Sequence, residues 1–164
     1  MHEHEADIDE ALVRRLVAAQ MPDLASMPLA MVEPWGTDNA IWRLGDDLVV
    51  RLPRVDGAQG QGDKEARWLP LIAPHLTIAV PQQVAVGEPA FGYPYRWAVH
   101  RWIDGEGARL ERMRDPVEFA RDLARAVREL QAMPIEGAPP PRHRARPLAD
   151  YDGPTRRAIE GAAL

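Results

Sequence analysis

The sequence has 164 residues, no cysteine and a formal net charge of −5, with 46% hydrophobic and 27% charged residues. This length and composition allow one domain with a buried core and exclude a disordered chain, while the lack of cysteine excludes disulfides and thiolate metal sites. The mild acidity argues against a general nucleic-acid-binding protein, and no apolar run approaches the roughly 20 residues that span a bilayer. We therefore expect a cytoplasmic protein with neither nucleic acid nor membrane as a partner.

The first predicted helix begins at a capping box. Asp7 is predicted to be the N-cap residue, with Glu10 as its partner three residues later. Apolar residues then recur at helical spacing as far as Gln20: Ile8, Leu12, Leu16 and Val17. This pattern predicts an amphipathic helix.

Three strands are expected next. A short strand is predicted over 29–33, followed by a hairpin of Ala40–Leu44 and Leu48–Leu52. The segment Gly45-Asp46-Asp47 between the last two has the composition of a tight turn.

A second helix is predicted over Asp63–Ala73, where Pro70 should disturb the helix or shift its boundary. Two more strands, Val84–Gly87 and Tyr95–Ile103, follow it. His100 falls within the last of these strands, and we expect it to be structural rather than catalytic.

The third predicted helix starts at Asp115-Pro116, with proline at the first helical position, and runs to about Met133. It carries an apolar stripe: Phe119, Leu123, Val127 and Leu130. The segment 134–157 is rich in Pro and Arg and is predicted to be a linker or an extended segment, and another helix is expected to begin at Thr155.

This order of elements predicts an α+β fold, in which a five-stranded antiparallel sheet has a helix inserted after its third strand and the helices lie on one side. Arg51 is unusual in this scheme because it lies among apolar neighbours in Leu48–Leu52. A buried guanidinium is costly unless it is paired, so Arg51 either faces solvent at an edge or meets an anionic group.

Glu65 on the following helix is a natural partner for Arg51, which points to the same face of the strand as Val49. The loop Gly36–Asn39 would expose backbone N–H groups near that face. Such a cation, acid and loop can hold a nucleotide. From the spacing alone, a surface ion pair of little energetic value is the alternative.

The order and spacing of these elements resemble the N-terminal lobe of the protein-kinase-like fold, in the branch of the aminoglycoside phosphotransferases. In that family a basic residue on strand three pairs with a glutamate on the next helix and contacts the nucleotide phosphates. Arg51 in LVVRLPR and Glu65 in DKEARWLPLIAP match those positions. YRWAVHRWIDGEGA resembles the fifth strand and the hinge, and EFARDLARAVRELQAMP resembles the first helix of the C-terminal lobe.

The resemblance implies a site for ATP with Mg²⁺. At the phosphates, Arg51 would bind phosphate, Glu65 would orient Arg51, and a loop would cover the phosphates: Gly36, Thr37, Asp38 and Asn39. The resemblance also implies that Ile41 and Val49 line an apolar slot for adenine. Backbone groups near Arg101 and Ile103 would form hydrogen bonds with adenine, and Trp102 would contact the nucleotide.

Two features depart from the family pattern. The cation on strand three is Arg rather than Lys, which keeps the charge but changes the donor geometry. The His-Gly-Asp catalytic loop and the later acidic metal-binding motif are absent from the sequence, and Asp150 and Asp152 lack the context of that motif. We therefore assign no catalytic residue and no metal ligand, and we do not expect a metal site at His2 and His4.

The sequence thus predicts a truncated kinase, with a nucleotide-binding lobe over residues 1–103 and the beginning of a helical lobe over 104–164. A complete enzyme would transfer a phosphoryl group from ATP to a hydroxyl of a small molecule, and this chain alone is expected to be inactive. The acceptor stays open among aminoglycoside, macrolide, choline-like and sugar-like molecules. The alternative is a non-catalytic binding module that self-associates through an apolar surface around Trp102, Phe119 and Leu123.

Overall fold

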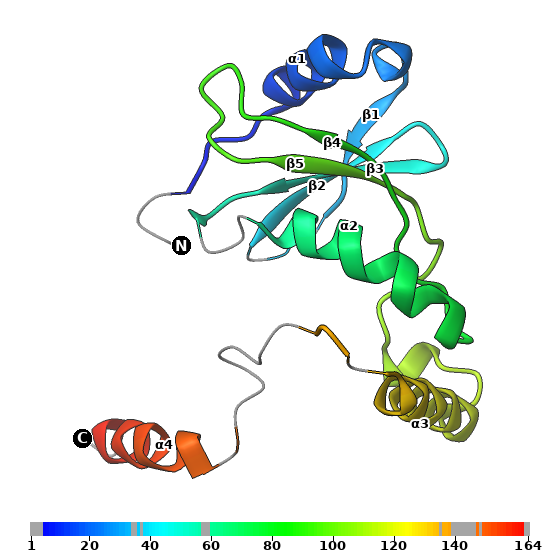
Figure 1. The fold of residues 1–164 in the computed structure, drawn as a ribbon, viewed down its shortest axis with the longest axis vertical. Coiled ribbons are helices and arrows are strands. Elements are labelled where there is room, and N and C mark those ends of the chain that lie inside the picture. Colours follow the sequence, from blue (N-terminus) through cyan, green and yellow to red (C-terminus); the bar gives the residue numbers. More distant parts are fainter. Residues whose placement is uncertain are drawn as a thin grey trace. The chain divides into compact units, whose positions relative to one another are not determined.

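The structure is a computed structural model that describes residues 5–33, 36, 38–56, 60–134, 136–138, 147 and 149–162. The chain forms two compact units, Met1–Met133 and Pro134–Leu164. The main elements in chain order are α1 (Glu10–Gln20), β1 (Leu29–Met31), β2 (Asn39–Leu44), β3 (Leu48–Pro53), α2 (Gln61–Ile72), β4 (Gln83–Gly87), β5 (Trp97–Arg101), α3 (Pro116–Ala132) and α4 (Ala149–Ala162). Figure 1 shows these elements.

The five strands form one antiparallel sheet in the order β1-β2-β3-β5-β4. The predicted α+β arrangement with a helix inserted after the third strand is confirmed. Strand β3 is the central strand, and Arg51 lies opposite Ile41 of β2 and Ala98 of β5. Arg51 is therefore not on an edge strand, which removes one of the two explanations for its position.

The two faces of the sheet meet different helices (Figure 1). Along β3, Leu48, Val50 and Leu52 are buried in the same cluster as the apolar side of α1. Val49 and Arg51 point the other way, and Arg51 bonds to α2. The expectation that the helices share one side is wrong, because alternation along β3 gives α1 an apolar face and α2 a polar one.

The hydrophobic core lies between α1 and the sheet. Its main members are these buried side chains: Val13, Leu16 and Val17 of α1, and Ala40, Trp42, Leu44, Leu48, Val50, Leu52, Trp97 and Val99 of the strands. Gly87 of β4 lies opposite Trp97, and a Cβ atom at Gly87 would lie 2.0 Å from Cε2 of that indole. Only glycine lets the tryptophan pack over β4 at this point of the register.

Helix α1 begins later than the capping box predicts. Asp9, not Asp7, is the N-cap residue, and its carboxylate accepts a hydrogen bond of 2.7 Å from the Leu12 N–H. Ile8, just before the cap, and Val13, at the fourth helical position, both lie in the core. This is the arrangement of a hydrophobic staple, and burial of Ile8 explains why the helix starts after it.

Other boundaries shift by a few residues. Helix α2 starts at Gln61 and continues through Pro70 to Ile72 before a short 3₁₀ turn, and β5 is shorter than predicted at both ends. The prediction of a linker over 134–157 is partly wrong, because α4 begins at Ala149 and not at Thr155.

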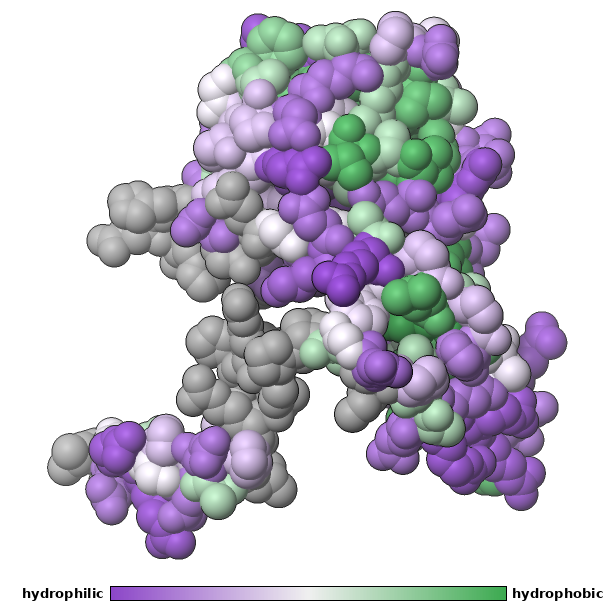
Figure 2. Space-filling view, in the orientation of Figure 1, coloured by the Kyte–Doolittle hydropathy of each residue, from purple (hydrophilic) through white to green (hydrophobic). Residues whose placement is uncertain are grey.

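Helix α3 forms as predicted, with Asp115 accepting hydrogen bonds from the N–H groups of Val117 and Glu118. Its apolar stripe is exposed: Val117, Phe119, Leu123, Val127 and Leu130. Figure 2 shows that hydrophobic side chains also reach the surface over the sheet half of this unit, whereas α3 presents mainly hydrophilic side chains in that view. Within the described residues, no helix is long and apolar enough to cross a membrane.

Candidate functional site

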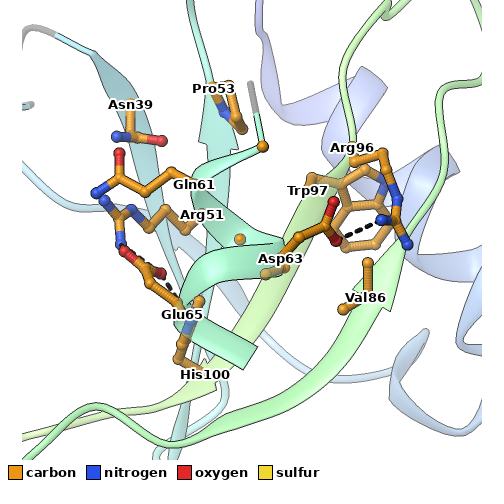
Figure 3. Close-up of a pocket in the computed structure, with 13 residues that line it drawn as sticks. Asn39, Arg51, Pro53, Gln61, Asp63, Glu65, Val86, Arg96, Trp97 and His100 are labelled. Atoms are coloured by element: carbon orange, nitrogen blue, oxygen red, sulfur yellow. Dashed lines mark hydrogen bonds and ion pairs between the residues drawn. The ribbon is translucent and has the colours of Figure 1, made fainter. Parts of the chain in front are cut away.

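An ion pair joins the central strand to the inserted helix. Nη1 of Arg51 lies 2.7 Å from Oε1 and 2.9 Å from Oε2 of Glu65 (Figure 3). The two side chains are 28% and 18% exposed, so the pair is more buried than a surface contact. The predicted pairing is confirmed, and Arg51 has its anionic partner within the chain.

The protonation of Glu65 follows from its surroundings. Partial burial by itself would raise the pKa of its carboxyl, but the hydrogen bond to His100 and the positive charge of Arg51 outweigh burial and hold the pKa below its usual value. Glu65 is therefore ionised at neutral pH. Removing either partner of such a pair leaves a partly buried charge without compensation.

His100 lies on the same face as the ion pair, on β5. It is opposite Val49 in the register, two positions along from the pair formed by Arg51 and Ala98 and so on the same face of the sheet. Its Nε2 is 3.4 Å from Oε2 of Glu65, and its side chain is 4% exposed. Sequence reasoning gave His100 no role in the site; the available signal was a lone histidine on the strand beside β3, at a position that shares the face of Arg51.

A cleft of about 410 Å³ opens beside the ion pair. It is lined by Gly36, Asn39, Ile41, Val49, Arg51, Pro81, His100, Arg101, Trp102 and Ile103. The structure thus brings together most of the residues that the resemblance singled out, from β2, β3 and the end of β5. Its volume lies in the range of sites that bind small molecules.

A second, smaller hollow adjoins the ion pair on the side of α2 (Figure 3). Asn39, Arg51 and His100 line both spaces, whereas Glu65 lines only the second. Arg96 forms an ion pair with Asp63 at the far end of this hollow. Asn39, Arg51 and His100 therefore lie between the cleft and the hollow.

The loop before β2 is only partly placed at the cleft. Gly36 and Asn39 line it, but Asp38 does not, and its carbonyl accepts a hydrogen bond of 2.8 Å from the Arg54 N–H. Thr37 lies outside the described residues. The described end of the loop is thus tied to the end of β3.

The segment after β5 forms the other wall. The Arg101 N–H donates to the Gln82 carbonyl and the Trp102 N–H donates to the Asp47 carbonyl, each at 2.8 Å. These two donors are used within the fold. The Ile103 N–H has no hydrogen-bond partner in the described part of the chain, so it is the donor of this wall that stays available.

Trp102 is held on two sides. Its indole N–H donates to Oδ1 of Asp104 at 2.8 Å, and the guanidinium of Arg43 lies 4.0 Å from its ring centroid. Arg43 in turn donates to the carbonyls of Gly45 and Asp46 in the hairpin turn. The resemblance had singled out Trp102 but not Arg43, which a cation–π contact places over the ring.

Across the described ranges, no group of three or more acidic or histidine side chains is close enough to hold an ion. Asp150 and Asp152 lie in the first turn of α4, and Asp152 pairs with Arg156. His2 and His4 lie outside the described residues.

A sequence profile of the APH phosphotransferase enzyme family matches residues 33–163. This chain belongs to that family. The match begins just after β1 and includes every residue of the cleft and of the ion pair. The comparison with curated protein sequences found no match.

Solved structures of aminoglycoside phosphotransferases share the fold of this family member. A GDP and kanamycin complex of APH(2")-IIia has a TM-score of 0.67 at 23% identity, over 77% of this chain and 43% of that one. The GDP complex of wild-type aminoglycoside 2'-phosphotransferase-IIIa has a TM-score of 0.69 at 23% identity, over 79% and 44%.

A streptomycin–ATP ternary complex of APH(2")-IIa has a TM-score of 0.56 at 18% identity, over 80% of this chain and 42% of that one. The alignments with this chain therefore cover less than half the length of these structures. Its sheet and helices match their N-terminal lobe.

Proposed function

We propose that this chain is the ATP-binding part of a small-molecule kinase, in which the γ-phosphoryl group of ATP passes to a hydroxyl of the acceptor. The observation that carries the proposal is the cleft, where an apolar slot meets a paired arginine. Family membership supports phosphoryl transfer, and the fold-related proteins are GDP, ADP and ATP complexes. The division into a nucleotide-binding lobe over 1–103 and the start of a helical lobe over 104–164 is part of this proposal.

The phosphates would bind at Arg51. Only Nη1 of its guanidinium bonds to Glu65, Nε and Nη2 make no hydrogen bond within the described residues, and Arg51 lines the cleft. An arginine held at one nitrogen can still present a second donor edge to a phosphate. Glu65 would orient Arg51, and the loop that includes Gly36, Thr37, Asp38 and Asn39 would cover the phosphates.

The base would occupy the apolar end of the cleft. Ile41 and Val49 are half-buried and point into it from neighbouring strands. The Ile103 N–H, which has no hydrogen-bond partner among the described residues, supports a role as the backbone donor to adenine. Trp102, whose ring contacts Arg43, would contact the nucleotide at the mouth. The Arg101 N–H is used by Gln82, so any contact of Arg101 with the base would come from another group.

Mg²⁺ would accompany the nucleotide. The described residues contain no acidic cluster that fits the ion, so we derive no step through it and assign it no ligand in this chain. An aspartate that orients and deprotonates the acceptor hydroxyl belongs to the His-Gly-Asp motif, which the sequence does not contain.

The proposal therefore predicts binding without turnover. Purified chain titrated with ATP and Mg²⁺ by calorimetry should show a saturable site, and labelled ATP should transfer no phosphate to a panel of aminoglycosides, macrolides, choline and sugars. Transfer to any acceptor by this chain alone would refute the expected inactivity. Aminoglycosides come first in the panel because two fold-related complexes contain kanamycin and streptomycin.

The exposed stripe of α3 supports a second candidate, a non-catalytic module that self-associates through this surface. Light scattering over a range of concentrations separates the two, since a monomer at high concentration contradicts the module. A cytoplasmic location stays a prediction, and the resemblance to an antibiotic-resistance family does not prove a role in resistance.

A further inference from the structure

His100 is the one buried residue with a polar or charged side chain in the described part of the chain. Neither of its ring nitrogens makes a hydrogen bond of standard geometry there. Buried polar groups are almost always paired, because an unpaired one has lost its hydrogen bonds to water without replacement. The described residues of β5 give the His100 ring no hydrogen-bond partner, so its partner must come from another element.

The neighbour that can pair with it is Glu65. Oε2 of this carboxylate lies 2.9 Å from Nη1 of Arg51 and 3.4 Å from Nε2 of His100. The two contacts come from different strands, β3 and β5, and meet at one oxygen that α2 brings over the sheet. Figure 3 shows the three side chains gathered at the end of α2.

We propose that His100 is a positioning residue whose ring, with a proton on Nε2, is the second donor to Glu65 and so fixes the carboxylate that holds Arg51. The proposal rests on the proposed function in one respect, namely that Arg51 binds the nucleotide phosphates. Its geometric part, the bond from His100 to Glu65, stands without a nucleotide.

A second hydrogen-bond donor to Glu65 matters because Arg51 contacts this carboxylate through a single nitrogen, Nη1. One donor between two oxygens lets a carboxylate rotate about its Cγ–Cδ bond, whereas a donor from another strand stops that rotation. The pKa of Glu65 is lowered, which is the direction expected when a donor such as His100 stabilises its ionised form. His100 further forms part of the cleft wall, so its ring fixes the distance between the ion pair and the ligand.

The test compares two replacements of similar size. His100→Phe keeps a buried ring but has no donor, and His100→Gln keeps a donor. We expect His100→Phe to weaken binding of a fluorescent ATP analogue with Mg²⁺ by about three- to tenfold, and His100→Gln to restore most of the affinity. In a Glu65→Gln background His100→Phe should have no further effect, because the residue acts through Glu65.

Thermal unfolding of each variant separates positioning from folding. His75→Phe, at an exposed position in the 3₁₀ turn after α2, is the matched control and should bind like the parent chain. Equal affinity of His100→Phe and the parent, with binding intact, would overturn the inference and leave the proposed function standing. Weakened binding that persists in the Glu65→Gln background would also overturn it.

Nitrogen NMR of the imidazole gives a readout that needs no ligand. The His100 signals, assigned by their loss in His100→Gln, should show the Nε2–H tautomer, and Glu65→Gln should shift Nε2 more than Nδ1. An Nδ1–H tautomer, or a spectrum that does not respond to Glu65→Gln, would overturn the inference even if the chain binds no nucleotide. Absence of nucleotide binding with the expected spectrum would instead refute only the proposed function.

Discussion

The two faces of the sheet carry different chemistry although the same strands build both. On the α1 face, Leu48, Val50 and Leu52 of β3 are buried in an apolar core. On the opposite face, Val49, Arg51 and His100 line a cleft, and Arg51 bonds to Glu65 of α2. Alternation along a strand lets stability and binding be placed on adjacent residues, so mutations on the two faces should separate the two properties.

The largest effect is expected on the core face, at Gly87→Ala. The new methyl group would lie 2.0 Å from the Trp97 indole, and the strand or the ring must move. We expect the free energy of unfolding to fall by about 3 kcal/mol, the upper end for overpacking of a rigid site. Urea unfolding measures this loss. Gly92→Ala, at a position with no atom within 4 Å of the added Cβ but with a positive φ, is the control for backbone strain and should lose less.

Adjacent valines on β3 give the most direct comparison of the faces. Val50→Ala should lower the free energy of unfolding by about 2 kcal/mol, because it opens a cavity in the core. Val49→Ala should cost less stability but weaken nucleotide binding, because Val49 is half-buried and lines the cleft. Equal stability losses, or weaker binding by Val50→Ala than by Val49→Ala, would contradict the division between the faces.

A smaller effect is expected in the pH dependence of stability. The pKa of Glu65 is lower in the folded chain than its usual value, so the ionised carboxylate stabilises the fold above the unfolded-state pKa. This stabilisation is lost as the pH falls through the folded-state pKa. We expect Glu65→Gln to remove about 1 kcal/mol or less of acid-dependent stability, since the pair is partly solvated. If the free energy of unfolding of the parent chain and of Glu65→Gln fell equally as the pH is lowered, the lowered pKa of Glu65 would be contradicted.

Local patterns predicted the elements that depend on neighbours in sequence. Alternation in LVVRLPR placed Arg51 on a polar face, and the following helix offered Glu65, so their pairing followed from short-range geometry. The N-cap was misplaced because Asp7 and Asp9 both precede the apolar run. Only the burial of Ile8 in the tertiary structure decides between the two caps.

Contacts between distant segments were not predictable in this way. Arg43 and Trp102 lie on different elements, and no spacing rule links them. His100 between apolar residues looks the same in the sequence whether it fills the core or meets a carboxylate.

The central claim is that Arg51, held by Glu65, binds the phosphates of a nucleotide in the cleft. The most direct test is calorimetric titration of this chain and its Arg51→Ala variant with ATP and Mg²⁺, with Arg14→Ala on the exposed side of α1 as the control. The account predicts saturable binding by the parent and the control, and at least about tenfold weaker binding by Arg51→Ala, since a charge-assisted contact is worth about 1.5–3 kcal/mol. Equal affinity of the parent and Arg51→Ala would contradict it.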